Sequence, residues 1–231
     1  LQERAANGTL TILSDGKNDQ DSLFLRALQP FGGNDVSKSL RALWTVHVLS
    51  QSIVEPKVQG GAKADRPSLK EGLKSLEVYL LNMCLQVRKD ENVAAWAVQL
   101  LFENREWLND NNRHVQQLFQ RLPSLAEQTQ SPLLRLYLAS ALQRMPTEMR
   151  FDIASRLLNS HPADEADHNL PLMYWYGIEP LVASDARLGL VLAYSSRFPK
   201  VVRFIARRMA SDDKSLGVLF ESVTKRPEAV D

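Results

Sequence analysis

The sequence is poor in the side chains that build most redox and metal centres. Its 231 residues include one cysteine, Cys84, and four histidines. A single cysteine cannot close an internal disulfide, complete a zinc cluster or provide the Cys-x-x-Cys-His attachment of a c-type haem. Cys84 also lies in an apolar helical run, which indicates a buried thiol. The sequence therefore predicts no metal and no cofactor in this chain.

Long apolar runs and an excess of one charge are also missing. No run approaches the roughly 20 apolar residues of a membrane-spanning helix, so no direct membrane insertion is expected. The 28 Lys and Arg residues against 27 Asp and Glu give a net charge of +1, which creates no global field for nucleic acid or membrane. Both ends of the sequence are polar and unpatterned, and we expect the chain to be a fragment of a longer protein.

The motifs that usually mark catalysis are absent as well. No serine lies in a Gly-x-Ser-x-Gly elbow. The glycine pairs 32–33 and 60–61 are not followed by the Lys-Ser/Thr of a phosphate-binding loop. We therefore expect no catalytic residue in the chain and interpret it as a non-enzyme.

What is present is helical patterning. No stretch alternates with period two, whereas apolar residues recur at helical spacing along most of the chain, which predicts an all-α fold. Residues 1–34 read as a polar lead-in with a short helix at 21–28. Residues 35–231 read as one helical-repeat domain with a mobile loop at about 55–68. The predicted helices of this domain cover 35–53, 69–88, 92–103, 113–129, 131–144, 146–160, 170–183, 186–196, 199–210 and 216–225.

A large aromatic side chain recurs in the middle of these helices, at intervals of roughly 30 to 50 residues. Paired helices with a period of about 40 to 47 residues are typical of HEAT and armadillo repeats. One helix pair cannot bury both of its faces, so stacked pairs would share a continuous core. The prediction is an α-α superhelix of stacked HEAT/armadillo-like pairs; the alternative is an irregular helical bundle. The recurring aromatics are Trp44, Trp96, Tyr137, Trp175 and Phe204.

Histidines and carboxylates gather between residues 161 and 169. A His-x2-Asp-Glu-x-Asp-His spacing could bring imidazole and carboxylate groups onto a metal ion. A flexible loop fixes no such geometry, and Asp or Asn before a helix is a natural cap. We interpret the segment as a solvated loop with capping residues. The residues in question are His161, Asp164, Glu165, Asp167 and His168.

Cations gather in the segment 187–208, which contains no acidic residue. Arg203 and Arg207 share a helix face at i, i+4. Such a face could hold phosphates of a nucleic acid, complement the carboxyl end of its helix, or meet an acidic partner surface. We predict a possible interaction surface formed by Arg197, Lys200, Arg203, Arg207 and Arg208.

Five blocks of the chain, within 39–208, resemble a known family. They are similar to the helical-repeat section of the large haem-binding, membrane-bound-dehydrogenase-type proteins of planctomycetes, verrucomicrobia and their relatives. The blocks are LRALWTVH (40–47), NVAAWAVQLL (92–101), LLRLYLASALQRMP (133–146), DHNLPLMYWYGIEPL (167–181) and VVRFIARR (201–208).

The resemblance implies a periplasmic or cell-surface, redox-linked parent protein. In that family a sugar-dehydrogenase-like β-propeller usually precedes the repeats, and a c-type cytochrome module carrying haem c usually follows them. The haem-attachment motif has no counterpart here, so the resemblance transfers no catalytic residue. It implies a scaffold or docking segment whose partners are neighbouring domains or another protein. The alternative function, which the cationic segment 187–208 suggests, is that of a helical-repeat nucleic-acid-binding protein.

Overall fold

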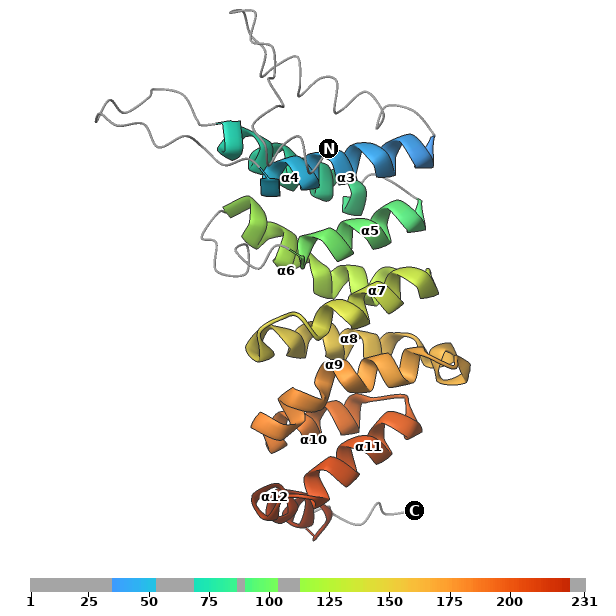
Figure 1. Cartoon of the computed structure of the whole chain (residues 1–231). Coiled ribbons are helices and arrows are strands. Elements are labelled where there is room, and N and C mark those ends of the chain that lie inside the picture. The colour runs from blue at the N-terminus through green and yellow to red at the C-terminus, as the bar shows by residue number, and fades with distance from the viewer. Residues whose placement is uncertain (1–34, 53–68, 87–89, 104–112, 225–231) are drawn as a thin grey trace, which may run out of the picture. The chain divides into compact units, whose positions relative to one another are not determined.

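The computed structural model describes residues 35–52, 69–86, 90–103 and 113–224 (Figure 1). Within these residues the chain forms ten α-helices and no strand, which confirms the predicted all-α class. The predicted short helix at 21–28 and the predicted loop at about 55–68 lie outside the described residues. The α-helices are α3 (Val36–Ser52), α4 (Leu69–Gln86), α5 (Glu91–Leu101), α6 (Arg113–Gln128), α7 (Pro132–Leu142), α8 (Arg150–Ser160), α9 (Leu170–Ser184), α10 (Ala186–Ser195), α11 (Pro199–Ala210) and α12 (Asp213–Thr224).

Two predicted helices differ from the observed ones at their first turns. The helix predicted from residue 146 begins as a 3-10 turn, η3 (Thr147–Met149), and becomes α8 only at Arg150. Short 3-10 turns are frequent where a helix begins. α12 begins at Asp213, three residues before the predicted start, because the Asp212 carboxylate accepts from both the backbone N–H and the hydroxyl of Ser215.

Local signals explain several other helix boundaries. Ser131 is the N-cap of α7, since its hydroxyl accepts from Leu134 N–H at 3.1 Å and Pro132 follows at the first helical position. Asp185 caps α10 in the same way, accepting from the backbone of Arg187 and Leu188. Pro123 does not split its helix, because α6 runs through it from Arg113 to Gln128.

The described residues fall into two compact units, 1–101 and 102–231. In the first unit α3, α4 and α5 each pack against the other two. Leu43, Leu80 and Leu81 are fully buried there. The rings of Trp44 and Trp96 meet edge to face, with centroids 4.9 Å apart, and join α3 to α5.

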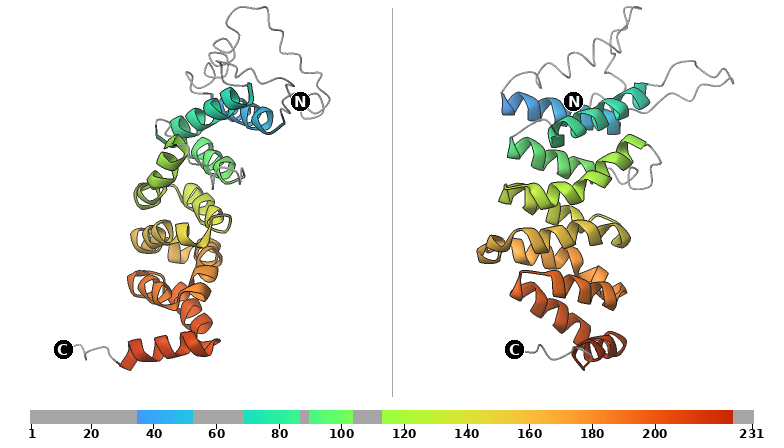
Figure 2. Two further views of the ribbon diagram at one scale, coloured as in Figure 1. Left: turned by 90° about the vertical axis from the view of Figure 1, so that its left-hand side faces the viewer. Right: turned by 180° about the vertical axis from the view of Figure 1, so that it is seen from behind.

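In the second unit the helices pack against their next-but-one neighbours, and from α7 onward they also pack against their successors. One row contains α7, α9 and α11, and the other contains α6, α8, α10 and α12 (Figure 2). Neighbours within a row are in contact, and from α7 onward consecutive helices join one row to the other. The core between the rows contains Leu138, Leu142, Leu157, Ile178 and Ile205, all nearly or completely buried.

One glycine is required by the packing within the first of these rows. Gly177 on α9 faces Leu142 on α7, and a Cβ built at residue 177 would lie 2.8 Å from the Leu142 Cβ. Leu142 is itself fully buried, so it has little space to withdraw. The absence of a side chain at Gly177 lets α7 and α9 approach closely.

The recurring aromatics are less buried than a shared core would require. Trp44 is 39% exposed, and Trp96, Tyr137, Trp175 and Phe204 are only partly buried. The fully buried large aromatics are Tyr174, Phe198 and Phe102. These rings lie at the edge of the core, where Trp44 meets Trp96 and Trp175 meets Phe204.

Candidate interaction surface

A buried ionic cluster lies where α7, α9 and the 3-10 turn η4 (Pro162–Ala166) meet. The Arg135 guanidinium donates from Nε and Nη2 to the two Asp164 carboxylate oxygens, each at 2.6 Å, and from Nη1 to the Thr129 carbonyl at 3.0 Å. The Tyr174 hydroxyl donates to the same carboxylate at 2.7 Å. Every oxygen of Asp164 is thereby engaged inside the protein. The cluster fixes the turn against two helices.

The electrostatics of this cluster follow from its burial. Burial opposes the charge on Arg135, but the Asp164 carboxylate outweighs it, and the pKa of the guanidinium is raised. Burial, together with the hydrogen bond to Asp164, raises the pKa of the Tyr174 hydroxyl far above its ordinary value of 10.0. Tyr174 is thus held as a neutral donor, which suits a structural contact and not a proton-transfer group.

The segment 161–169 is only partly the solvated loop that the sequence predicts, since most of its residues are exposed but two are buried. Asp164 and His161 are buried, at 4% and 7% exposure, and the His161 ring contacts the Ala126 carbonyl at 2.6 Å through Nε2. The capping prediction holds for Asp167, whose carboxylate accepts from Asn169 and Leu170 N–H groups. These two hydrogen bonds lower its pKa. His168 is exposed.

The residues of this segment do not converge on a common point. The carboxylate of Asp164 points to Arg135, and Glu165 accepts from the Lys200 backbone N–H at 3.3 Å. In the part of the chain that the structure describes, no three His, Cys, Asp or Glu side chains form a group suited to a metal ion.

A second buried arginine, Arg150, has carbonyl oxygens as partners. Its guanidinium donates to Met145 at 3.0 Å and to Gly177 at 2.9 Å, with a longer contact of 3.4 Å to Gln143. Burial lowers its pKa, although Glu148 acts in the opposite direction. Arg150 thus ties the end of α7 to α9 near Pro180, whose ring removes one helical hydrogen bond.

The first unit contains its own buried polar group on α3 and α4. The Glu77 carboxylate is completely buried; one oxygen meets His47 Nδ1 at 2.5 Å and the other accepts from the Ser50 hydroxyl at 2.5 Å. The carboxylate stands between the histidine and the serine, so the imidazole is not the partner that a serine nucleophile needs. Glu77 is not among the residues predicted from the sequence. The available signal was a charged residue at i+4 from Leu73, on the apolar stripe of its helix.

The predicted cations lie on and beside α11, and they do not act as one cluster. Arg208 Nε donates to Glu179 on α9 at 2.7 Å, and Nη1 contacts Ser211 at 3.2 Å. Arg197 Nε donates to Asn159 at 3.3 Å. Arg203 and Arg207 are exposed, and neither of them forms an ion pair with another described residue.

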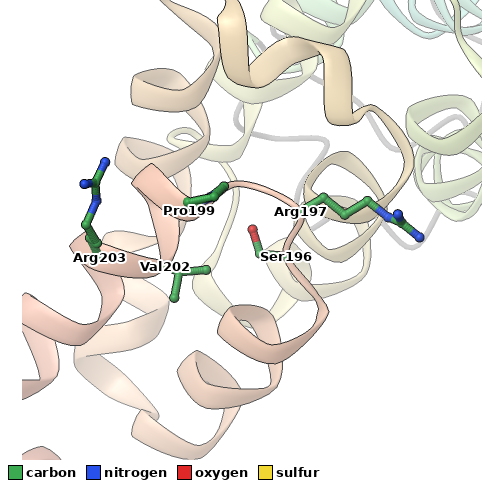
Figure 3. A pocket seen from close by; sticks show the side chains of 5 residues that line it. All are labelled: Ser196, Arg197, Pro199, Val202 and Arg203. Carbon is green, nitrogen blue, oxygen red and sulfur yellow. The ribbon is translucent and has the colours of Figure 1, made fainter.

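An open depression of about 590 Å³ lies at the start of α11 (Figure 3). Figure 3 shows the Ser196 hydroxyl near its centre, with the Arg197 and Arg203 side chains directed to opposite sides. The two guanidinium groups therefore do not converge on a single ligand. The lining residues are Ser196, Arg197, Pro199, Val202 and Arg203.

No family model, curated protein or solved structure matches this chain. None of the helices in the described ranges combines the length and apolar character that crossing a membrane requires.

Proposed function

We propose that the chain is a non-catalytic helical-repeat scaffold of the HEAT/armadillo kind, which serves as a docking segment. The observation that carries this proposal is the packing of the second unit, where the helices contact their next-but-one neighbours and, from α7 onward, also their successors. A closed bundle instead gathers its helices around one shared core. Contacts limited to neighbours are typical of stacked repeats.

Two ion pairs with the same separation in sequence support the repeat interpretation. Glu127 on α6 pairs with Arg156 on α8 at 3.0 Å, and Glu179 on α9 pairs with Arg208 on α11 at 2.7 Å. Both pairs join residues 29 positions apart, one within each row. These exposed or half-exposed pairs contribute little energy, but they place successive helices in an equivalent register.

The partners of the buried polar groups favour a scaffold over an enzyme. Asp164, Arg150 and Glu77 are each satisfied by groups of the same unit. Neither Asp164 nor Arg150 lines the depression beside α11. Reactive groups used in this way stabilise the fold and leave the exposed faces for binding.

Deletion of residues 196–231, which removes α11 and α12, tests the repeat architecture. We expect the shortened chain to lose helical circular dichroism roughly in proportion to the deleted helices and to keep cooperative unfolding in urea. Complete loss of cooperative unfolding would instead indicate a single shared core and would overturn the repeat proposal.

On the resemblance of its five sequence blocks, we also propose that the chain is the repeat section of a larger exported, redox-linked protein with a c-type cytochrome module. The test is the visible absorption spectrum of the full-length parent protein, oxidised and reduced. A c-type haem spectrum in the parent, with this segment colourless, supports the proposal. A colourless parent contradicts it and leaves the scaffold proposal unaffected.

A further inference from the structure

We propose that the solvent-facing side of α11 docks an acidic, partly apolar segment of another protein. This cationic face consists of Lys200, Arg203 and Arg207, with the Trp175–Phe204 ring pair beside it. The inference rests on the proposed scaffold function and assigns a binding surface and a partner chemistry to it.

The direction of the cationic face follows from the opposite side of the same helix. Val201, Ile205 and Met209 are completely buried and define the core-facing side of α11. Arg203 and Arg207, at i+2 from Val201 and Ile205, are exposed on the other side. α11 contains no acidic residue, so no intrahelical pair neutralises them.

Three other arginines of the second unit have partners within the protein. Arg135 binds Asp164, Arg150 binds backbone carbonyls, and Arg156 binds Glu127. Glu179, the one acidic residue in α9, is engaged by Arg208. The neighbouring helix of the row therefore supplies no free carboxylate to the cationic face. The Glu165 carboxylate accepts from the Lys200 backbone N–H, so the positive charge available to a partner is mainly that of the exposed Arg203 and Arg207.

Aromatic side chains border the cationic face. Phe204 lies at i+4 from Lys200 and three residues before Arg207, so all three share one side of α11. Its ring packs against Trp175 of α9, with centroids 5.6 Å apart, and both rings keep part of their surface in water. Tyr176, the next residue, is 54% exposed. Arginine, tryptophan and tyrosine are the residues most enriched in the energetic centres of protein interfaces.

The arrangement favours an acidic protein segment over a nucleic acid. Arg197 and Arg203 point to opposite sides of the depression, so the cations form no continuous track for a phosphate backbone (Figure 3). The Trp175 and Phe204 rings pack on each other and so do not present two free faces for stacked bases. An acidic segment needs only carboxylates over Arg203 and Arg207 and an apolar side chain against the ring pair.

The test uses the full chain and a fluorescently labelled peptide, Glu-Glu-Leu-Trp-Glu-Glu-Leu-Asp, in an anisotropy titration at about 20 mM salt, where screening is weak. We expect R203E/R207E to weaken binding by at least about tenfold and R203Q/R207Q to weaken it less, since removing a charge costs less than reversing it. The matched control, R187E/K214E, changes the net charge equally on α10 and α12 and should leave binding within about twofold.

Three results would overturn the inference. They are absence of peptide binding, equal loss in R203E/R207E and in the control, and undiminished binding of the peptide with Gln and Asn in place of Glu and Asp. Duplex DNA that binds where the acidic peptide does not would assign the face to nucleic acid instead. Circular dichroism confirms that each variant is folded. If the peptide does not bind, but the 196–231 deletion loses helical signal in proportion to the deleted helices, only the docking face is rejected. If the deletion loses cooperative unfolding, the scaffold proposal is rejected.

Discussion

The Arg135 guanidinium and the Asp164 carboxylate form a bidentate ion pair, with both N–O distances at 2.6 Å and side-chain exposures of 7% and 5%. The two residues are 29 positions apart and lie on different elements. Such a pair is not strongly stabilising as a whole, because both charges leave water. Removing one partner, however, leaves the other charge buried without compensation.

Asp164→Ala should therefore destabilise the second unit by about 3–5 kcal/mol. Urea denaturation followed by circular dichroism measures the loss. The double variant Arg135→Met/Asp164→Leu, which removes both charges, should recover most of it. A single substitution that costs less than about 1 kcal/mol would contradict the assigned burial of the pair.

Tyr174 should make stability fall above pH 10. Its folded-state pKa is raised above the ordinary 10.0 by burial and by Asp164. Its contribution is fully present below pH 10.0, and above that pH the unfolded chain loses the proton that the folded chain retains. The free energy of unfolding should therefore decrease more steeply with pH in the natural sequence than in Tyr174→Phe. The difference between the two slopes should reach about 1.4 kcal/mol per pH unit. Parallel slopes in urea titrations of the two proteins would show that Tyr174 ionises normally.

Gly177→Ala should destabilise the protein although alanine favours helix. The new Cβ would lie 2.8 Å from the Leu142 Cβ, and relieving that overlap costs about 1–3 kcal/mol. Gly217→Ala on α12 is the matched control, since nothing lies within 4 Å of its added Cβ. The control should gain about 0.5–1 kcal/mol from helix propensity. Thermal or urea unfolding of both variants should thus give opposite signs, and equal signs would refute the close approach of α7 and α9.

Phe198→Ala should cost more stability than Trp175→Ala. The Phe198 ring is completely buried and meets Tyr174 edge to face at 5.4 Å, so its loss leaves a cavity worth about 3–5 kcal/mol. The partly exposed Trp175 should cost less, about 1–2 kcal/mol, because part of its surface already contacts water. The reverse order in urea denaturation would mean that the recurring aromatics form the core after all.

Local signals in the sequence predicted the helices well. The helix predicted at 131–144 begins at Ser131, which caps α7, and the helix predicted at 199–210 coincides with α11. These features depend on residues within one or two helical turns. They can be recognised without knowledge of the neighbouring helix.

Features that depend on a distant partner were not predictable in this way. Asp164 lies in a polar segment, and its burial becomes favourable only because Arg135, from another helix, neutralises it. Trp44 belongs to the apolar stripe of α3 but lies at its margin, where the position of α5 decides that its ring meets Trp96 and stays 39% exposed. The available charge of Arg203 likewise depends on Glu179 binding Arg208.

The 29-residue separation of Arg135 and Asp164 also has a consequence during synthesis of the chain. A ribosome adds about 5–20 residues per second, so Arg135 is part of the chain for roughly 1–6 s before Asp164 has been made. During that interval the guanidinium must remain hydrated, and the face of α7 that carries it cannot be sealed. Its final packing is therefore expected to be a late event, triggered when the turn η4 leaves the ribosome, and α9 can close over Arg135 only after its counter-ion has arrived.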